Sequence, residues 1–185
     1  MMGSLRGVII EILPTALLME VQGVGFEVRV TTSTLSRLGV NDECLVYIYE
    51  HIREDCHNLY GFLAAEERRF FETLISVSGV GPRIGLGLLS GGSLSEIKDA
   101  IAAGNVVRLS SVPGVGKKTA QKIILELKGR LVEDEIASDR NRDLIEALMA
   151  LGYTSSQAKE AARRVEPNVS DMSDRVREAL KYVSK

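Results

Sequence analysis

Apolar and polar residues alternate along the first third of the chain. In FEVRV, the apolar residues Phe26, Val28 and Val30 are separated by charged ones, which is the period of a β-strand. The segments LLMEV and FEVRV flank the turn sequence QGVG, and CLVYIYEHI and NLYGF flank the polar segment REDCH. The pattern predicts two hairpins within a small barrel or sandwich over residues 1–63.

From residue 64 the apolar spacing changes to that of a helix. In AAEERRFFETLISV, Phe70, Leu74 and Val77 recur at helical spacing, and short helices separated by glycine loops are expected to follow. The segment VEDEIASDRN is polar and highly charged, and we interpret it as a linker. The sequence therefore predicts a helical domain over residues 64–131 and a linker over 132–141.

The last part of the chain, residues 142–185, predicts a compact unit of three helices. Gly152 ends the first helix, and Thr154 with Gln157 fits a capping box for the second. Apolar residues recur at helical spacing in the first and third helices: Leu144, Ile145, Leu148, Met149 and Leu151, then Met172, Val176, Ala179, Leu180 and Val183. Because so small a core leaves no room for an enclosed catalytic site, docking to a protein partner is the expected use of this unit.

The helical domain contains an internal repeat. LISVSGVGPRIGLGLL, residues 74–89, aligns with LSSVPGVGKKTAQKII, residues 109–124, at a constant offset of 35 residues. Gly-Val-Gly recurs in both copies, and the apolar positions match except where Thr119 stands opposite Ile84. Each copy is typical of a helix–hairpin–helix element, in which a glycine turn joins two short helices.

Such an element binds phosphate through the N-terminus of its second helix. The free N–H groups and the positive end of the helix dipole favour one phosphate oxygen there, and glycine lets another backbone come close. Because nothing in the site reads bases, we expect DNA binding that is independent of sequence. The predicted phosphate-binding residues are Gly79, Gly81 and Arg83 in the first copy, and Gly114, Gly116, Lys117, Lys118, Thr119 and Lys122 in the second.

A nucleotide-binding loop and a turn without any ligand both fit the glycine repeats less well. A nucleotide-binding loop, G-x-x-x-x-G-K-[ST], would need Gly where Ser111 stands and Ser or Thr where Lys118 stands. A tight turn that binds nothing would account for one isolated copy. Two copies in the only basic third of the chain favour DNA, because residues 63–131 hold 10 basic and 6 acidic residues while the chain as a whole carries −2.

Further features of the composition exclude several classes. No run of 18 or more apolar residues predicts a membrane span, and Glu11 interrupts the apolar N-terminal segment too early for a signal peptide. Cys44 and Cys56 are expected to be reduced in a cytoplasmic chain. With His51 and His57 they make no recognised metal pattern, and we predict no metal and no cofactor.

The order of these parts, with GVGFEVRV, HIREDCHNLYGF, SGVGPRIGLGLLS and VPGVGKKTAQKIILELKGRL, resembles the RuvA family of bacterial Holliday-junction binding proteins over essentially the whole chain. The resemblance implies an α+β fold: an OB-like β-barrel, a tandem helix–hairpin–helix domain and a small, UBA-like three-helix domain. It also implies a homotetramer that holds a four-way junction open and square-planar, with one or two tetramers per junction left open.

The resemblance further implies partners and one more site. The C-terminal domain would bind the hexameric ATPase RuvB, and this chain would be the non-catalytic subunit of a branch-migration helicase in recombination, DNA repair and the SOS response to DNA damage. Glu54 and Asp55 would form an acidic pin at the centre of the tetramer, where carboxylates repel phosphates and give specificity rather than affinity. From residues alone, a solvated acidic turn is the favoured interpretation of the pair, and the resemblance reverses that preference.

Two rival classes of function stay open from the residues. The first is an enzyme: a helix–hairpin–helix glycosylase needs a catalytic Asp near the second hairpin, but the next acidic residues there are Glu126 and Glu133. A metal nuclease needs clustered carboxylates, and the barrel offers only the pair at 54 and 55. The second class, a plain duplex-binding repair scaffold, shares every feature except the acidic pin.

One departure concerns the second helix of the first copy, PRIGLGLL. Gly85 and Gly87 each lower helix stability by roughly 0.5–1 kcal/mol relative to Ala. This helix is therefore expected to be short or closely packed.

Overall fold

The computed structural model describes residues 1–54, 56–166, 169 and 171–183, with the backbone alone at 130, 132–140, 156 and 163. It divides into two compact units, Met1–Gly129 and Arg130–Lys185. Within the described residues, no helix is long and apolar enough to cross a membrane.

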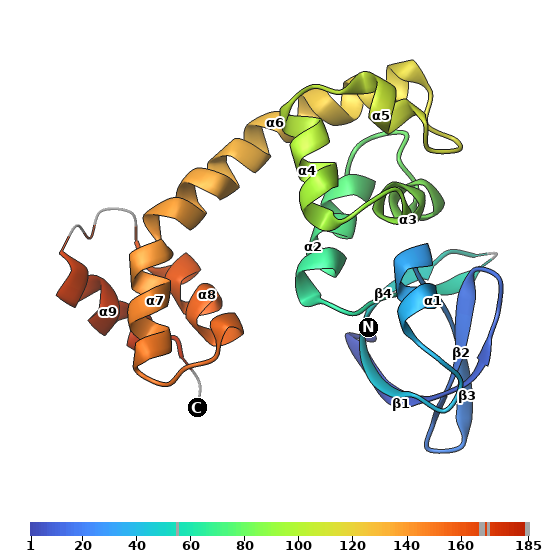
Figure 1. The fold of residues 1–185 in the computed structure, drawn as a ribbon, viewed down its shortest axis with the longest axis horizontal. Helices are drawn as coiled ribbons and strands as arrows, with labels where there is room; N and C mark the ends of the chain where they lie inside the picture. The colour runs from blue at the N-terminus through green and yellow to red at the C-terminus, as the bar shows by residue number, and fades with distance from the viewer. Residues whose placement is uncertain (55, 167–168, 170, 184–185) are drawn as a thin grey trace. The chain divides into compact units, whose positions relative to one another are not determined.

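A closed barrel forms the first part of the chain, with the strand order β1-β2-β3-β5-β4 (Figure 1). All neighbouring strands are antiparallel except β3 and β5, which are parallel. The strands are β1 (Ser4–Ile12), β2 (Ala16–Val21), β3 (Val24–Arg29), β4 (Glu43–Ile52) and β5 (His57–Phe62), and a short helix, α1 (Thr32–Arg37), lies between β3 and β4. Alternate residues fill the interior: Leu5, Ile9, Leu17, Met19, Val28, Val46, Ile48 and Leu59. The predicted OB-like barrel is confirmed.

Both predicted hairpins of the barrel are present. β2 and β3 pair around Gln22 and Gly23, whose φ angles of 51° and 83° are both positive. Two consecutive left-handed residues make the turn whose twist fits a tight hairpin. β4 and β5 pair as far as Ile52 and His57, and the loop that carries the predicted acidic pin joins them.

Helices follow the barrel, as the change in apolar spacing predicts; the first four are short and the last has 24 residues. They are α2 (Ala65–Ile75), α3 (Pro82–Ser90), α4 (Leu94–Ala102), α5 (Val106–Ser110) and α6 (Lys117–Arg140). The fully buried ring of Phe71 joins α2 to the barrel, with its centroid 5.3 Å from that of Tyr49, 5.5 Å from Tyr60 and 4.9 Å from Phe62. The barrel and the first helices therefore share one aromatic core.

Three helices make the C-terminal core: α7 (Arg142–Ala150), α8 (Ser155–Arg164) and α9 (Met172–Leu180). Gly152, with a φ of 92°, follows α7, and Thr154 and Gln157 form the predicted capping box of α8. Four residues of the predicted apolar faces are exposed instead of buried: Met149, Leu151, Met172 and Leu180. Arg175 is buried in this unit and donates to Asn141 Oδ1 at 2.6 Å.

Residues 132–140, interpreted as linker, are helical and continue α6 to Arg140. The physical reason is that the segment contains neither Gly nor Pro, so nothing in its backbone stops a helix that has already started. The domain boundaries at 131 and 141 stay a prediction.

Candidate DNA-binding site

The two copies of the sequence repeat have the same backbone hydrogen bonds. Four bonds of the first copy each have a counterpart 35 residues later, with N···O distances between 2.9 and 3.4 Å. In the first copy they run from Ser76 to Glu72, Val77 to Leu74, Val80 to Val77 and Gly85 to Gly81; in the second, from Ser111 to Val107, Val112 to Leu109, Val115 to Val112 and Ala120 to Gly116. The repeat in the sequence is therefore a repeat of structure.

Glycine makes each turn possible. Gly79 and Gly114 have φ angles of 92° and 87°, in the left-handed region that side-chain-bearing residues rarely adopt. Gly81 and Gly116 come just before α3 and α6, and a Cβ at either position would meet no atom within 4 Å. The space over both helix starts is open, so a phosphate group can approach the backbone there.

The charges at the helix starts favour an anion. Neither α3 nor α6 has an acidic residue in its first turn. Arg83, Lys117 and Lys118 are exposed, whereas Lys122 is half-buried with its Nζ 3.9 Å from Glu126 Oε1. Thr119 is half-buried too. The three exposed side chains can reach a ligand, and Lys122 is already partly neutralised.

The two hairpins pack directly against each other. A Cβ at Gly87 would lie 3.2 Å from Val112 Cγ1, and the corresponding position on Gly114 lies 3.6 Å from Ile84 Cγ1. The apolar residues of both turns, Val77, Val80, Val112 and Val115, are buried. The nine-residue α3 is thus both short and closely packed, as its glycines predict, and the two predicted phosphate sites belong to one rigid pair.

The predicted acidic pin lies on the β4–β5 loop. Glu54 is exposed, and Arg53 N–H donates to the carbonyl of Cys56 at 2.8 Å across the loop. Asp55 lies outside the described residues. The structure thus places Glu54 on an exposed loop tip, and its role stays a prediction.

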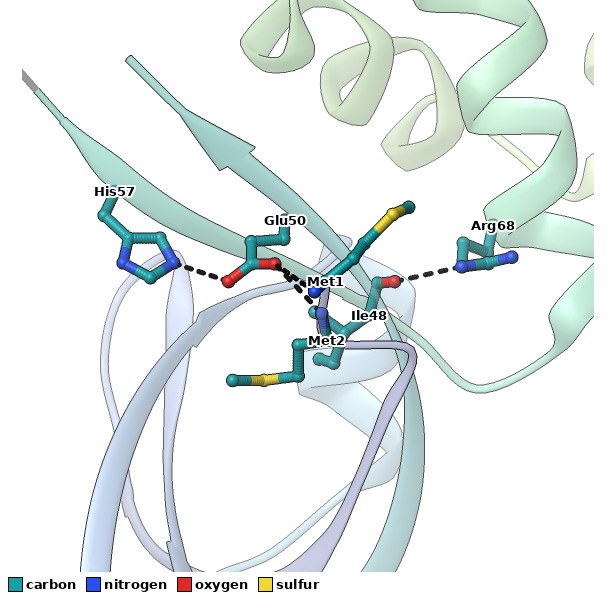
Figure 2. Close-up of polar contacts among 6 residues, drawn as sticks. All are labelled: Met1, Met2, Ile48, Glu50, His57 and Arg68. Carbon is teal, nitrogen blue, oxygen red and sulfur yellow. Dashed lines mark hydrogen bonds and ion pairs between the residues drawn. The ribbon is translucent and has the colours of Figure 1, made fainter. Parts of the chain in front are cut away.

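Sequence reasoning missed a contact network behind that loop. Figure 2 shows the carboxylate of Glu50 between the Met2 backbone and His57. Glu50 Oε2 accepts from Met2 N–H at 2.9 Å, and Glu50 Oε1 lies 2.9 Å from His57 Nε2. The Met2 N–H, and after it His57, lower the pKa of Glu50. Nearby, Arg68 of α2 donates from Nη1 to the carbonyl of Ile48 at 3.2 Å.

The only sequence signal for this network is one acidic residue inside an apolar strand segment. The network holds the N-terminal residue Met2 against the β4–β5 hairpin, on the side where α2 meets the barrel. In the part of the chain that the structure describes, no three His, Cys, Asp or Glu side chains gather as metal ligands would.

Comparisons with known families cover nearly the whole chain. Residues 1–61 match the RuvA N terminal domain, residues 71–129 the SAM-like helix-hairpin-helix tandem, and residues 139–184 the RuvA C-terminal domain.

Curated relatives match over their full length and that of this chain. Three of them are named Holliday junction branch migration complex subunit RuvA: 41% identical in Janthinobacterium sp., 42% in Paraburkholderia phytofirmans and 40% in Neisseria meningitidis. In each case 100% of this chain and 100% of the relative are covered.

Proposed function

The chain belongs to the RuvA family, and from that premise we propose that it binds four-way DNA junctions independently of sequence and serves as the junction-binding subunit of a branch migration complex. It has no catalytic role of its own in this proposal. The ATP-driven step belongs to a partner, and the chain supplies the grip on DNA in recombination and repair.

One observation carries the proposal: two hairpins with the same backbone hydrogen bonds present open helix N-termini beside exposed cations. Helix N–H groups and the helix dipole bind phosphate oxygens, and such contacts carry no base information. We therefore assign phosphate binding to Gly79, Gly81 and Arg83 and to the second-copy residues Gly114, Gly116, Lys117, Lys118, Thr119 and Lys122. Among these, Lys122 contributes least because Glu126 lies beside it.

The pin accounts for a preference for junctions over duplex. Carboxylates at Glu54 and Asp55 repel phosphates, so continuous duplex across the centre of an assembly is disfavoured while separating strands are tolerated. Neutralising both with Glu54→Gln and Asp55→Asn should lower the preference for a junction but leave binding to both DNAs intact.

The partner and the assembly complete the proposal. We assign binding of the hexameric ATPase RuvB to the C-terminal helices, because their exposed apolar residues Met149, Leu151 and Tyr182 offer a docking surface.

We propose a homotetramer in the cytoplasm. Exposed Val107 and Leu125, beside a groove of about 410 Å³ between the start of α5 and α6, support contact with other copies. Light scattering of the free chain and of its junction complex distinguishes one tetramer from two.

The test is a salt series of binding to a four-way junction and to a duplex of equal length. Wild type should prefer the junction and show a steep salt slope. Lys118→Ala should weaken binding to both DNAs and lower the slope by about one unit, since one phosphate contact contributes about 0.9. Gly116→Ala should also weaken binding without loss of folding, because its Cβ enters empty space that the phosphate needs.

Equal affinity for junction and duplex would reduce the chain to a general duplex-binding scaffold. An unchanged slope in Lys118→Ala together with full affinity in Gly116→Ala would remove the hairpins from the DNA interface. Cleavage or base release by the purified chain would point instead to an enzyme.

A further inference from the structure

A row of three side chains crosses the outer face of the barrel. Arg29 on β3 is the strand partner of Tyr60 on β5, and Tyr60 is the strand partner of Tyr49 on β4. Strand partners lie side by side on the same face of a sheet. Phe71 covers the two tyrosines, whereas Arg29 stands at the end of the row and is half-exposed. The row thus ends in a cation that solvent can reach.

The first hairpin is packed onto this same row. A Cβ at Gly85 of α3 would lie 3.1 Å from the Phe71 ring and 2.9 Å from Ile75 Cγ2, so the start of α3 sits directly on the residue that covers Tyr60. Arg83 belongs to that first turn of α3 and is exposed. Arg29 and Arg83 therefore belong to two elements, β3 and α3, that meet at the same aromatic group.

The electrostatics of Tyr60 agree with this placement. Burial is the largest influence and raises the pKa of its phenol, while the charges of Arg29 and Arg83 both act to lower it. A cation lowers the pKa of a phenol because it favours the phenolate, which agrees with the place of Arg29 beside Tyr60 in the strand register.

Neither cation is neutralised within the described chain. Arg68 and Arg108 pair with Glu72 and Glu96, but no ion pair or hydrogen bond in the described residues involves the side chain of Arg29 or Arg83. Two cations on elements that share one core repel each other, and an anion that both can reach offsets this repulsion.

We propose that Arg29 and Arg83 together hold one backbone phosphate of the DNA strand bound by the first hairpin. The proposal rests on the proposed function and adds a barrel residue to it. The second hairpin has two lysines, Lys117 and Lys118, at its helix start and the first has one arginine; Arg29 supplies the charge that the first copy lacks. The guanidinium fork suits phosphate oxygens, which two arginines can bind from two sides.

The experiment measures salt-dependent binding of the full chain to a four-way junction. The variants are Arg29→Gln, Arg83→Gln and the double variant. Arg37→Gln is the matched control, because Arg37 is an exposed barrel arginine on α1 without an ion pair in the described residues. Each single variant should lose about tenfold in affinity, while the control should match wild type. Because both residues hold the same phosphate, the double variant should lower the salt slope by about one unit, not two, and its loss should be less than the product of the single losses.

Each contrary outcome has its own meaning. Arg29→Gln behaving like Arg37→Gln would overturn the inference while the Lys118→Ala result leaves the hairpins in place. If the loss of affinity in the double variant equals the product of the single losses, and its salt slope falls by about two units, the two arginines bind separate phosphates. That result would also overturn the inference. Loss of assembly mass in Arg29→Gln, with folding intact by circular dichroism, would make Arg29 a subunit contact instead.

Arg29→Lys, which keeps the charge, should recover part of the affinity if the site is electrostatic. Unchanged binding in every variant, including Lys118→Ala, would remove both hairpins from the DNA interface, whereas equal affinity of wild type for junction and duplex would overturn the proposed function itself.

Discussion

The first hairpin turn, residues 76–81, and the second, residues 111–116, have one backbone design in two different surroundings. In the first, the preceding helix α2 carries the large residues Phe71 and Ile75, and Gly85 of α3 packs against both. At the equivalent positions 35 residues later stand Val106, Ser110 and Ala120. Large side chains meet glycine in one copy, and small side chains accompany alanine in the other.

The two copies also differ in what covers them. Ser90, at the end of α3, accepts from the Thr32 N–H of the barrel at 3.3 Å. Its counterpart in the second copy is Leu125, which is 82% exposed, and Val107 of α5 is 81% exposed. The face that the first copy turns to the barrel is therefore uncovered in the second.

The difference teaches which features belong to the hairpin and which to its setting. The glycines and the buried valines reproduce the turn in both copies, so they determine the backbone of the turn. The helices on either side of the turn differ with their surroundings. Those of the first copy pack against the barrel, whereas the second copy has exposed lysines at the start of the long helix α6.

Removing Phe71 should break this comparison most strongly. Phe71→Ala empties the aromatic core between the barrel and the first hairpin and should lower the free energy of unfolding by about 3–5 kcal/mol. Val106→Ala, at the equivalent half-buried position, should cost about 1 kcal/mol or less. Urea unfolding measures both, and hydrogen exchange should show the loss spreading into β4 and β5 only for Phe71→Ala. Equal costs would mean that the barrel contact is not what distinguishes the copies.

Adding a methyl group at Gly85 should sharpen the comparison. Gly85→Ala overfills the contact with Ile75 and Phe71, which costs about 1–3 kcal/mol, partly offset by about 1 kcal/mol of helix propensity. Gly129→Ala in α6 meets nothing within 4 Å and should stabilise by about 0.5–1 kcal/mol. Thermal melting of the two variants checks the opposite signs. A stabilised Gly85→Ala would show that the contact yields, and pairing it with Ile75→Ala should recover part of the loss.

The smallest effect is expected from acid, and it should act on the side of the first copy. The lowered pKa of Glu50 means that its contribution to stability is fully present above the ordinary value of about 4.5 and is lost as pH falls through the lowered value. Glu50→Gln should therefore be less stable than wild type at pH 7, with the difference disappearing in strong acid. Melting temperatures across pH 3–7 measure this, with Glu126→Gln near the second hairpin as the control. A gap between variant and wild type that stays constant with pH would contradict the assignment.

Local patterns in the sequence were enough to predict much of this fold. Strand alternation, the QGVG turn, the Thr154–Gln157 cap and the repeated glycine turns each depend on residues close together in the chain, and all are confirmed. Contacts between distant segments could not be predicted in the same way. Arg29 meets Tyr60 only because β3 pairs in parallel with β5, across an intervening helix and strand.

Charge was a poor guide in two places. The acidic segment at 132–140 is helical because it lacks helix-breaking residues, although its composition is that of a linker. Arg175 is buried and donates a hydrogen bond to the side chain of Asn141, which no pattern of apolar residues reveals. The phosphate-binding roles of the site residues stay a prediction, which their open geometry supports and the salt series tests.

The different side-chain sizes around Gly85 and Ala120 also mean that positions 71, 75 and 85 do not vary independently. With Phe71 and Ile75 in place, a methyl group at position 85 lies 2.9 Å from Ile75 Cγ2 and 3.1 Å from the Phe71 ring, so a neighbour has to shift or become smaller. A substitution at one of the three positions therefore changes the cost of a substitution at the other two. In the second copy, Val106, Ser110 and Ala120 hold the opposite combination of sizes.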